Sequence, residues 1–160
     1  MKEKAQKLLN IRIKNDLKIS LAESCTGGMV SSAIVSIPLA SSVFQYGLIT
    51  YSNESKSKLL QVPRSILIKH GAVSKQTAES MVEGLFNLSK ADFCIAITGI
   101  AGPSGGTKNK PVGLVYHSFL LKNKSPIIKK KLYLGNRNLI RKSATAYCLE
   151  KSFAIISSSI

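Results

Sequence analysis

The sequence predicts an α/β protein in which helices pack against a sheet in layers, and three observations support this fold class. Segments with strand-like and helix-like patterns alternate along most of the 160 residues, which is typical of layered α/β architectures. The last two strand-like segments follow each other without an intervening helix, so we expect a mixed sheet. A composition of 44% hydrophobic and 19% charged residues is typical of a globular chain, and the length suits one domain over residues 1–160.

The first half of the chain contains five of these segments. Apolar residues at helical spacing predict a helix over 2–14 and, after a short apolar strand over 17–22, a second helix over 26–37. Residues 43–51 are rich in aromatic and β-branched side chains, which favours a strand. A short helix over 53–60 is expected to follow this strand.

The second half is predicted to begin with helices. A helix is expected to start near Pro63, and Ser74 is the expected N-cap of a helix over 75–88 whose apolar residues form one stripe. The remaining elements are a buried strand over 93–98, a glycine-rich loop over 99–111, a strand pair over 112–120 and 127–134, and a final helix over 137–154.

The formal net charge of +15 is the strongest signal in the composition. Such a field attracts phosphates, anionic substrates, nucleic acid or acidic surfaces. The lysines are dispersed apart from Lys129–Lys131, aromatic residues make up only 6%, and tryptophan is absent, which is poor material for stacking bases. We therefore favour a solvated lysine-rich surface over a nucleic-acid footprint.

The sequence also limits location and cofactors. No run of about 18 apolar residues occurs, and polar residues interrupt the apolar ones near the N-terminus, so we expect neither a membrane span nor a secretory signal and place the chain in the cytoplasm. Cys25, Cys94 and Cys148 are far apart and form no pattern with histidine, so neither a disulfide framework nor a metal site is expected. We expect no cofactor, and the oligomeric state is left open.

The stretch Leu21–Gly28 (Leu-Ala-Glu-Ser-Cys-Thr-Gly-Gly) predicts a strand, a tight turn and the start of a helix. A serine at such a turn lies beside backbone N–H groups that the helix itself cannot use. These donors favour negative charge, either a phosphate or an oxyanion formed during acyl transfer. On these residues alone, Ser24 is either a helix cap or a nucleophile.

Two other segments are expected to meet this turn, because each lies at the end of a predicted strand, where ligands gather in α/β sheets. One is Thr50–Lys56, which contains Tyr51, and the other is the glycine-rich segment Thr98–Gly113. Neither a P-loop nor a G-x-S-x-G motif is present, and the two histidines are in no catalytic motif. If Ser24 is a nucleophile, a partly buried lysine is the better candidate for its base.

Taken together, five motifs in this order resemble the CinA C-terminal domain family: Ala-Glu-Ser-Cys-Thr-Gly-Gly, Thr-Tyr-Ser-Asn-Glu-Ser-Lys, His-Gly-Ala-Val-Ser, Thr-Gly-Ile-Ala-Gly-Pro and Lys-Pro-Val-Gly. The resemblance covers about residues 4–153 and is strongest to the stand-alone, PncC-like form. It implies a three-layer α/β/α sandwich with a mixed central sheet. It also implies nicotinamide-nucleotide amidase activity, in which nicotinamide mononucleotide (NMN) is hydrolysed to nicotinate mononucleotide and ammonia in pyridine nucleotide salvage.

The resemblance assigns residues to this chemistry. It implies that Ser24 is the nucleophile, that Lys56 and Tyr51 are catalytic, and that a basic residue near the start of the last helix, Arg137 or Arg141, contacts the substrate. The glycine-rich loop that lines the nucleotide site contributes Thr98, Gly99, Gly102 and Gly105.

The mechanism we expect has two covalent steps. Neutral Lys56, with Tyr51 relaying or orienting, takes the proton of Ser24, and an acyl-enzyme forms and is hydrolysed. The N–H groups of Thr26, Gly27 and Gly28 are the expected oxyanion donors. The alternative hypothesis is a non-catalytic family member that binds nucleotides or nucleic acid and is associated with competence or DNA repair.

Overall fold

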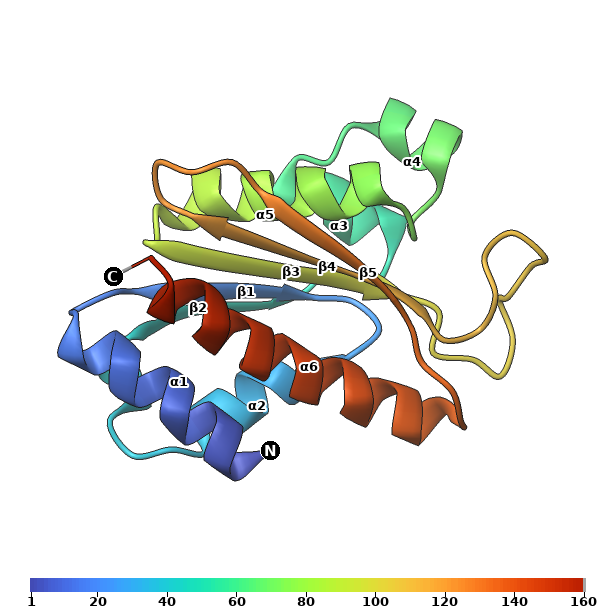
Figure 1. Ribbon diagram of the computed structural model, residues 1–160. Helices are drawn as coiled ribbons and strands as arrows, with labels where there is room; N and C mark the ends of the chain where they lie inside the picture. Colours follow the sequence, from blue (N-terminus) through green and yellow to red (C-terminus); the bar gives the residue numbers. More distant parts are fainter. Residues whose placement is uncertain (160) are drawn as a thin grey trace.

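The computed structural model describes residues 1–159 and contains one five-stranded sheet between two layers of helices (Figure 1). The strand order is β2-β1-β3-β4-β5, with β1 (Ile19–Glu23), β2 (Phe44–Ile49), β3 (Phe93–Gly99), β4 (Leu114–Leu121) and β5 (Ile127–Leu132). β1 runs parallel to β2 and β3, whereas β4 is antiparallel to β3 and β5. The predicted mixed sheet and three-layer sandwich are therefore confirmed.

Helices cover both faces of the sheet (Figure 1). The first face carries α1 (Lys2–Lys14), α2 (Met29–Val35) and α6 (Arg137–Ser157), and the second carries α3 (Asn53–Leu60), α4 (Arg64–His70) and α5 (Lys75–Ser89). The sequence did not predict the short 3-10 helix η1 (Ala40–Ser42). In the described part of the chain, we find no helix with both the length and the hydropathy to cross a membrane.

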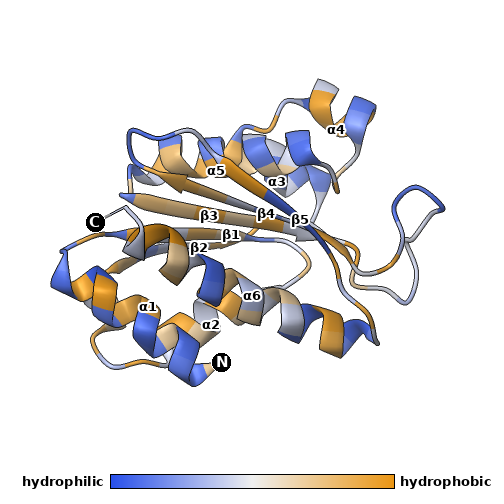
Figure 2. Cartoon of the chain, viewed as in Figure 1, coloured by the Kyte–Doolittle hydropathy of each residue, from blue (hydrophilic) through white to orange (hydrophobic). Residues whose placement is uncertain are grey.

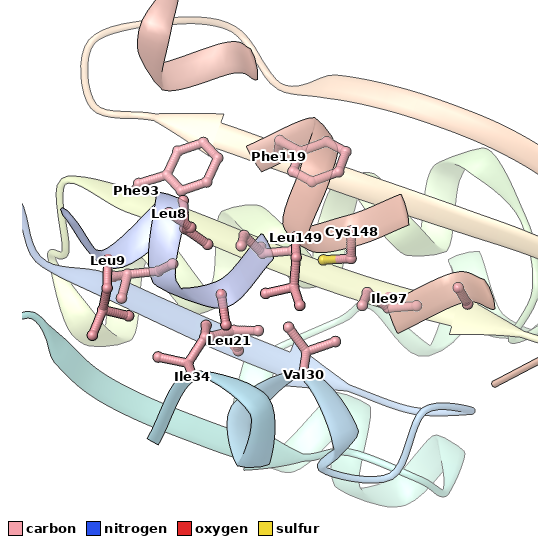
Figure 3. Close-up of a cluster of buried hydrophobic side chains, with 14 of the residues drawn as sticks. Leu8, Leu9, Leu21, Val30, Ile34, Phe93, Ile97, Phe119, Cys148 and Leu149 are labelled. Atoms are coloured by element: carbon pink, nitrogen blue, oxygen red, sulfur yellow. The ribbon is translucent and has the colours of Figure 1, made fainter. Parts of the chain in front are cut away.

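Alternating strand residues divide the core into two clusters. Ile19 and Leu21 of β1 pack with α1, α2 and α6, and Figure 3 shows much of this larger cluster. Ala22 instead packs with Met81 and other residues of α3, α4 and α5 on the opposite face. Figure 2 shows the same arrangement, with apolar strands in the centre and many hydrophilic positions on the helices around them. By this alternation, the side chain at position 24 is directed toward the α3–α5 layer.

Helix α2 differs most from its predicted range of 26–37, since it begins only at Met29 and ends at Val35. The backbone of Gly27 has φ +58° and that of Gly28 has φ +91°, which are left-handed conformations that interrupt a right-handed helix. The turn after β1 is therefore longer than the sequence pattern indicated. The helix near Pro63 is present as α4, and the strand pair is β4 and β5.

Candidate active site

The candidate active site lies at the edge of the sheet where the parallel strands β1, β2 and β3 end (Figure 1). Ser24 directly follows β1, and its N–H donates to the Ile97 carbonyl oxygen of β3 at 3.0 Å. On the other side, the Thr50 N–H donates to the Glu23 carbonyl oxygen at 2.8 Å. Ser24 is therefore held between two neighbouring strand ends, and it is only 7% exposed.

Lys56 of α3 is fully buried and reaches Ser24. Its Nζ lies 3.1 Å from Ser24 Oγ, and it donates to the carbonyl oxygens of Thr50 at 2.7 Å and Tyr51 at 3.3 Å. Burial lowers the pKa of Lys56 to about 8, because the apolar surroundings penalise the ammonium form. In the neutral amine, the two carbonyls can accept both N–H groups, which leaves the nitrogen lone pair facing the serine hydroxyl.

The start of α3 is fixed by a capping box. The Ser52 hydroxyl accepts from the Ser55 N–H at 3.0 Å, and the Ser55 hydroxyl lies 3.1 Å from the Ser52 N–H. This arrangement satisfies donors that the first helical turn leaves free. Because Lys56 follows Ser55 directly, the cap also fixes where the lysine side chain begins.

Glu23 is the residue that sequence reasoning missed, since it caps α2 in place of Ser24. Its buried carboxylate accepts from the N–H groups of Gly28, Val30 and Ser31 and from the Ser31 hydroxyl, at 2.7–3.1 Å. The available signal was a carboxylate just before a strand-to-helix turn, where it can meet the positive end of the helix. Of the two roles that the sequence left open for Ser24, the structure assigns the cap to Glu23.

The prediction that Gly27 and Gly28 offer free oxyanion donors is wrong. The Gly27 N–H donates to the Ser24 carbonyl oxygen at 3.0 Å, and the Gly28 N–H donates to the Glu23 carboxylate at 3.1 Å. The physical reason is the late start of α2, which uses these groups to close the turn. The N–H of Thr26 donates to no acceptor among the described residues.

Arg137 and Arg141 both lie in the first turns of α6, but they contact different parts of the site. The Arg137 guanidinium donates to the Gly102 carbonyl oxygen at 2.7 Å and to the Tyr51 hydroxyl at 2.9 Å. Arg141 instead donates to two carbonyl oxygens of the turn after β1, from Nε at 3.0 Å and from Nη2 at 2.8 Å. Arg137 is exposed at the rim of the site, whereas Arg141 is half-buried beneath the turn.

The structure does not place Tyr51 where it could relay the proton. Its side chain is 59% exposed, and its hydroxyl accepts from Arg137. Only its backbone carbonyl contacts the Lys56 amine. The predicted relay is therefore not supported, and Tyr51 belongs to the rim with Arg137.

The residues predicted in the glycine-rich loop have different environments. The Thr98 hydroxyl is buried and donates to the Ala72 carbonyl oxygen at 2.7 Å, which ties the end of β3 to the segment before α5. Gly99 is a close-packing position, because a Cβ there would lie 3.0 Å from Cys25 Sγ and 2.7 Å from a methyl group of Val115. The structure therefore gives Thr98 and Gly99 packing contacts with the protein. Gly102 contacts the rim arginine, and Gly105 is exposed.

Neither histidine forms a hydrogen bond with Ser24 in the described part of the chain. His117 is buried against Phe119, Tyr133 and Tyr147, and burial lowers its pKa to about 3. His70 ends α4, where its carbonyl oxygen accepts from Lys110 of the glycine-rich loop. Within residues 1–159, no three His, Cys, Asp or Glu side chains gather as metal ligands.

The fold and the site define an α/β/α sandwich with a serine and a buried lysine in hydrogen-bond contact at the strand ends. A family model described as the CinA C-terminal domain matches residues 1–155. The chain therefore belongs to the CinA C-terminal domain family, which confirms the resemblance noted in the sequence.

Individual relatives agree with this assignment. CinA-like proteins of Petrotoga mobilis and Thermotoga neapolitana are each 46% identical to this chain, over 140 and 149 residues; these cover 88% and 92% of the chain but 34% and 36% of those proteins. The chain thus spans about a third of their length. The crystal structure of the competence/damage inducible protein CihA from Agrobacterium tumefaciens has a TM-score of 0.94 and 37% identity, covering 96% of this chain and 94% of that one.

Proposed function

We propose that this protein is an amidohydrolase that hydrolyses the carboxamide of NMN, with Ser24 as nucleophile and Lys56 as base. The observation that carries the proposal is the 3.1 Å contact between Ser24 Oγ and a buried amine whose pKa is lowered to about 8. An amine of this pKa is a stronger candidate base than an exposed lysine, because much more of it is neutral near pH 7. The choice of NMN rests on the resemblance in five motifs.

In the first half of the reaction, Lys56 accepts the proton of Ser24 as Oγ bonds to the carboxamide carbon. The carbonyl electron pair moves to oxygen and forms a tetrahedral intermediate. The Lys56 ammonium then gives its proton to the amide nitrogen, the carbon–nitrogen bond breaks, and ammonia leaves an acyl-enzyme.

In the second half, Lys56 removes a proton from a water molecule that attacks the acyl carbon. The intermediate collapses, the ester bond to Ser24 breaks, and the proton on Lys56 returns to Oγ. Nicotinate mononucleotide leaves, and both side chains regain their starting protonation states. One lysine therefore serves as base and acid in both halves.

Arg137 is the proposed phosphate contact. It lies on the rim beside the glycine-rich loop, and its bonds to Gly102 and Tyr51 use only two of its donors. A guanidinium has five N–H groups, so several remain for a phosphate. The Nε and Nη2 atoms of Arg141 both donate to carbonyl oxygens of the turn after β1, and Arg141 is less exposed than Arg137.

The test is ammonia release from NMN by the purified protein. We expect Ser24→Ala and Lys56→Ala to abolish it, while Lys58→Ala, which removes an exposed lysine from the same helix, leaves it unchanged. A Ser24→Ala protein with full deamidation would refute the proposal. Salt-sensitive DNA binding by a wild-type protein without deamidation would favour the non-catalytic alternative.

A further inference from the structure

We propose that Arg141 is a positioning residue that turns the Thr26 N–H toward the oxyanion formed when Ser24 attacks a carboxamide. The proposal rests on the function proposed above and deepens it, because it assigns the oxyanion donor and the side chain that orients it. It follows from the hydrogen bonds that the backbone groups form in the turn between β1 and α2.

Of the five N–H groups from Ser24 to Gly28, three are donated to acceptors on other residues. Ser24 donates to Ile97 of β3, and the N–H groups of Gly27 and Gly28 close the turn as described above. Two remain without an acceptor on another residue in the described part of the chain, those of Cys25 and Thr26. The Cys25 N–H faces its own sulfur, a weak acceptor. Thr26 therefore has the free backbone donor nearest to the nucleophile along the chain.

Arg141 determines the direction of that donor. Its Nε donates to the Cys25 carbonyl oxygen at 3.0 Å, and its Nη2 donates to the Thr26 carbonyl oxygen at 2.8 Å. The first of these carbonyls belongs to the same peptide unit as the Thr26 N–H. In a planar trans peptide, the C=O and N–H groups point in opposite directions, so the Thr26 N–H is directed away from Arg141.

The side opposite Arg141 is the side of the nucleophile. Arg141 belongs to α6, which covers the first face of the sheet, whereas Ser24 contacts Lys56 of α3 on the second face. A donor directed away from α6 therefore points toward the layer that contains the base. The hydroxyl of Thr26 is also buried and has no hydrogen-bond partner in the described residues, so this residue has two unused donors.

The guanidinium is suited to this role because it holds two successive carbonyls with a rigid fork, which a lysine amine cannot reproduce. When Oγ bonds to the carboxamide carbon, the proton passes to Lys56 and the carbonyl electron pair becomes an oxyanion. A correctly aimed N–H stabilises that charge more than it stabilises the neutral substrate. Loss of Arg141 should therefore lower kcat with little change in KM.

The decisive variants are Arg141→Ala and Arg141→Lys, compared with Lys142→Ala, an exposed control on the same helix. We expect kcat for NMN to fall about 10²–10³-fold in Arg141→Ala, the loss typical of one oxyanion donor, with KM within about threefold. Added guanidinium ion should restore part of kcat. Arg137→Ala should show the opposite pattern, a raised KM. An unchanged kcat in folded Arg141→Ala, or a raised KM alone, would overturn the proposal.

A second measurement separates this inference from the choice of substrate. A fluorophosphonate probe phosphonylates serine nucleophiles: the Oγ–P bond forms, fluoride leaves, the proton passes to the base, and the phosphoryl oxygen takes the oxyanion position. We expect intact-mass labelling of wild type, none of Ser24→Ala, and slow labelling of Arg141→Lys. If the wild-type protein is labelled but does not hydrolyse NMN, then NMN is not the substrate, and slower labelling of Arg141→Lys would still support the role of Arg141. Equal labelling of wild type and Arg141→Lys, or no labelling of wild type, would overturn the inference.

Discussion

At the scale of single residues, the proposed chemistry depends on the burial of Lys56. A free lysine, with a pKa near 10.4, would be neutral in only about one molecule in 2,500 at pH 7. Burial lowers this pKa to about 8, so roughly one molecule in ten has the neutral amine at pH 7. Among residues 1–159, the lysine is paired with no carboxylate. Two backbone carbonyls accept both N–H groups of the neutral amine, and the ammonium form can donate its third N–H to Ser24 Oγ.

The pH dependence follows from this shift. In the proposed mechanism the neutral amine is the reactive form, so kcat/KM should rise with pH to a plateau above about 8, and should fall about tenfold per unit well below it. The check is a pH profile of NMN deamidation between about pH 5 and 10, with folding confirmed at each end. The substrate phosphate titrates near pH 6, so its effect on the profile can be distinguished from that of a lysine with a pKa of about 8. A limb near 6 with a flat profile through 8 would contradict a lysine base.

The Ser24–Lys56 pair could be predicted from the sequence because both residues belong to motifs that resemble those of the CinA C-terminal domain family. The side chains that bind the turn after β1 could not be predicted in this way. Arg141 lies more than 110 residues from Cys25 and Thr26 along the chain, and its bonds form only after α6 packs beside the turn. Glu23 can cap α2 only because the left-handed conformations of Gly27 and Gly28 delay the start of that helix, and the sequence pattern did not indicate this delay.

At the scale of elements, Glu23 joins β1 to α2. Its carboxylate receives four hydrogen bonds, three of them from backbone groups at the start of α2. Charged acceptors in such bonds are the stronger ones, and their loss leaves buried donors unsatisfied. A glutamine at position 23 would have nearly the same shape, but its NH₂ group would face some of these N–H donors and could not accept from them.

We therefore expect Glu23→Gln to lower the free energy of unfolding by at least about 2 kcal/mol, a fall in Tm of about 4–8 °C for a chain of this size. Glu54→Gln is the matched control, because Glu54 forms only an exposed ion pair with Lys58 within α3, and such pairs contribute well below 1 kcal/mol. Thermal unfolding of the two variants at neutral pH gives the comparison. Equal Tm values would mean that the carboxylate is not the cap.

Helix α3 holds Lys56 in place partly because α5 approaches it closely at Gly84. A Cβ at this position would lie 1.8 Å from the Leu60 carbonyl oxygen at the end of α3. Gly84→Ala should therefore force the two helices apart, cost about 1–3 kcal/mol, and reduce kcat strongly by moving the base. Asn87→Ala, on the exposed side of α5, should change neither. Unfolding and kinetic measurements on both variants test this, and normal activity in Gly84→Ala would refute it.

Strand and helix identities followed from hydrophobic spacing, because the packing faces of most elements are regular. The boundaries were less predictable where tertiary contacts determine them. The strand expected over 43–51 ends at Ile49, since Thr50 and Tyr51 present their carbonyls to Lys56. Likewise, the last helix extends beyond its predicted end to Ser157, with apolar residues still packed in the core.

At the scale of the whole molecule, the parallel arrangement of β1, β2 and β3 brings three distant motifs to one edge of the sheet. The fold thus accounts for the site without using the large positive charge. Among residues 1–159, five ion pairs lie within 4 Å, and all of their cationic side chains are at least 40% exposed. Most of the 23 lysines and arginines therefore repel one another without a local acidic partner.

Salt should consequently stabilise this protein. Raising NaCl from about 10 mM to about 300 mM shortens the screening length to several ångströms, which weakens like-charge repulsion more than the exposed ion pairs, whose individual contributions are small. We expect Tm to rise by several degrees, measured by thermal unfolding at pH 7. In the double variant Lys124→Glu and Lys129→Glu, which changes two exposed lysines, the rise should be smaller because the net charge is lower. A Tm that falls with salt would show that attractive pairs dominate the surface, and a steeper rise with phosphate than with chloride at equal ionic strength would indicate a specific anion site.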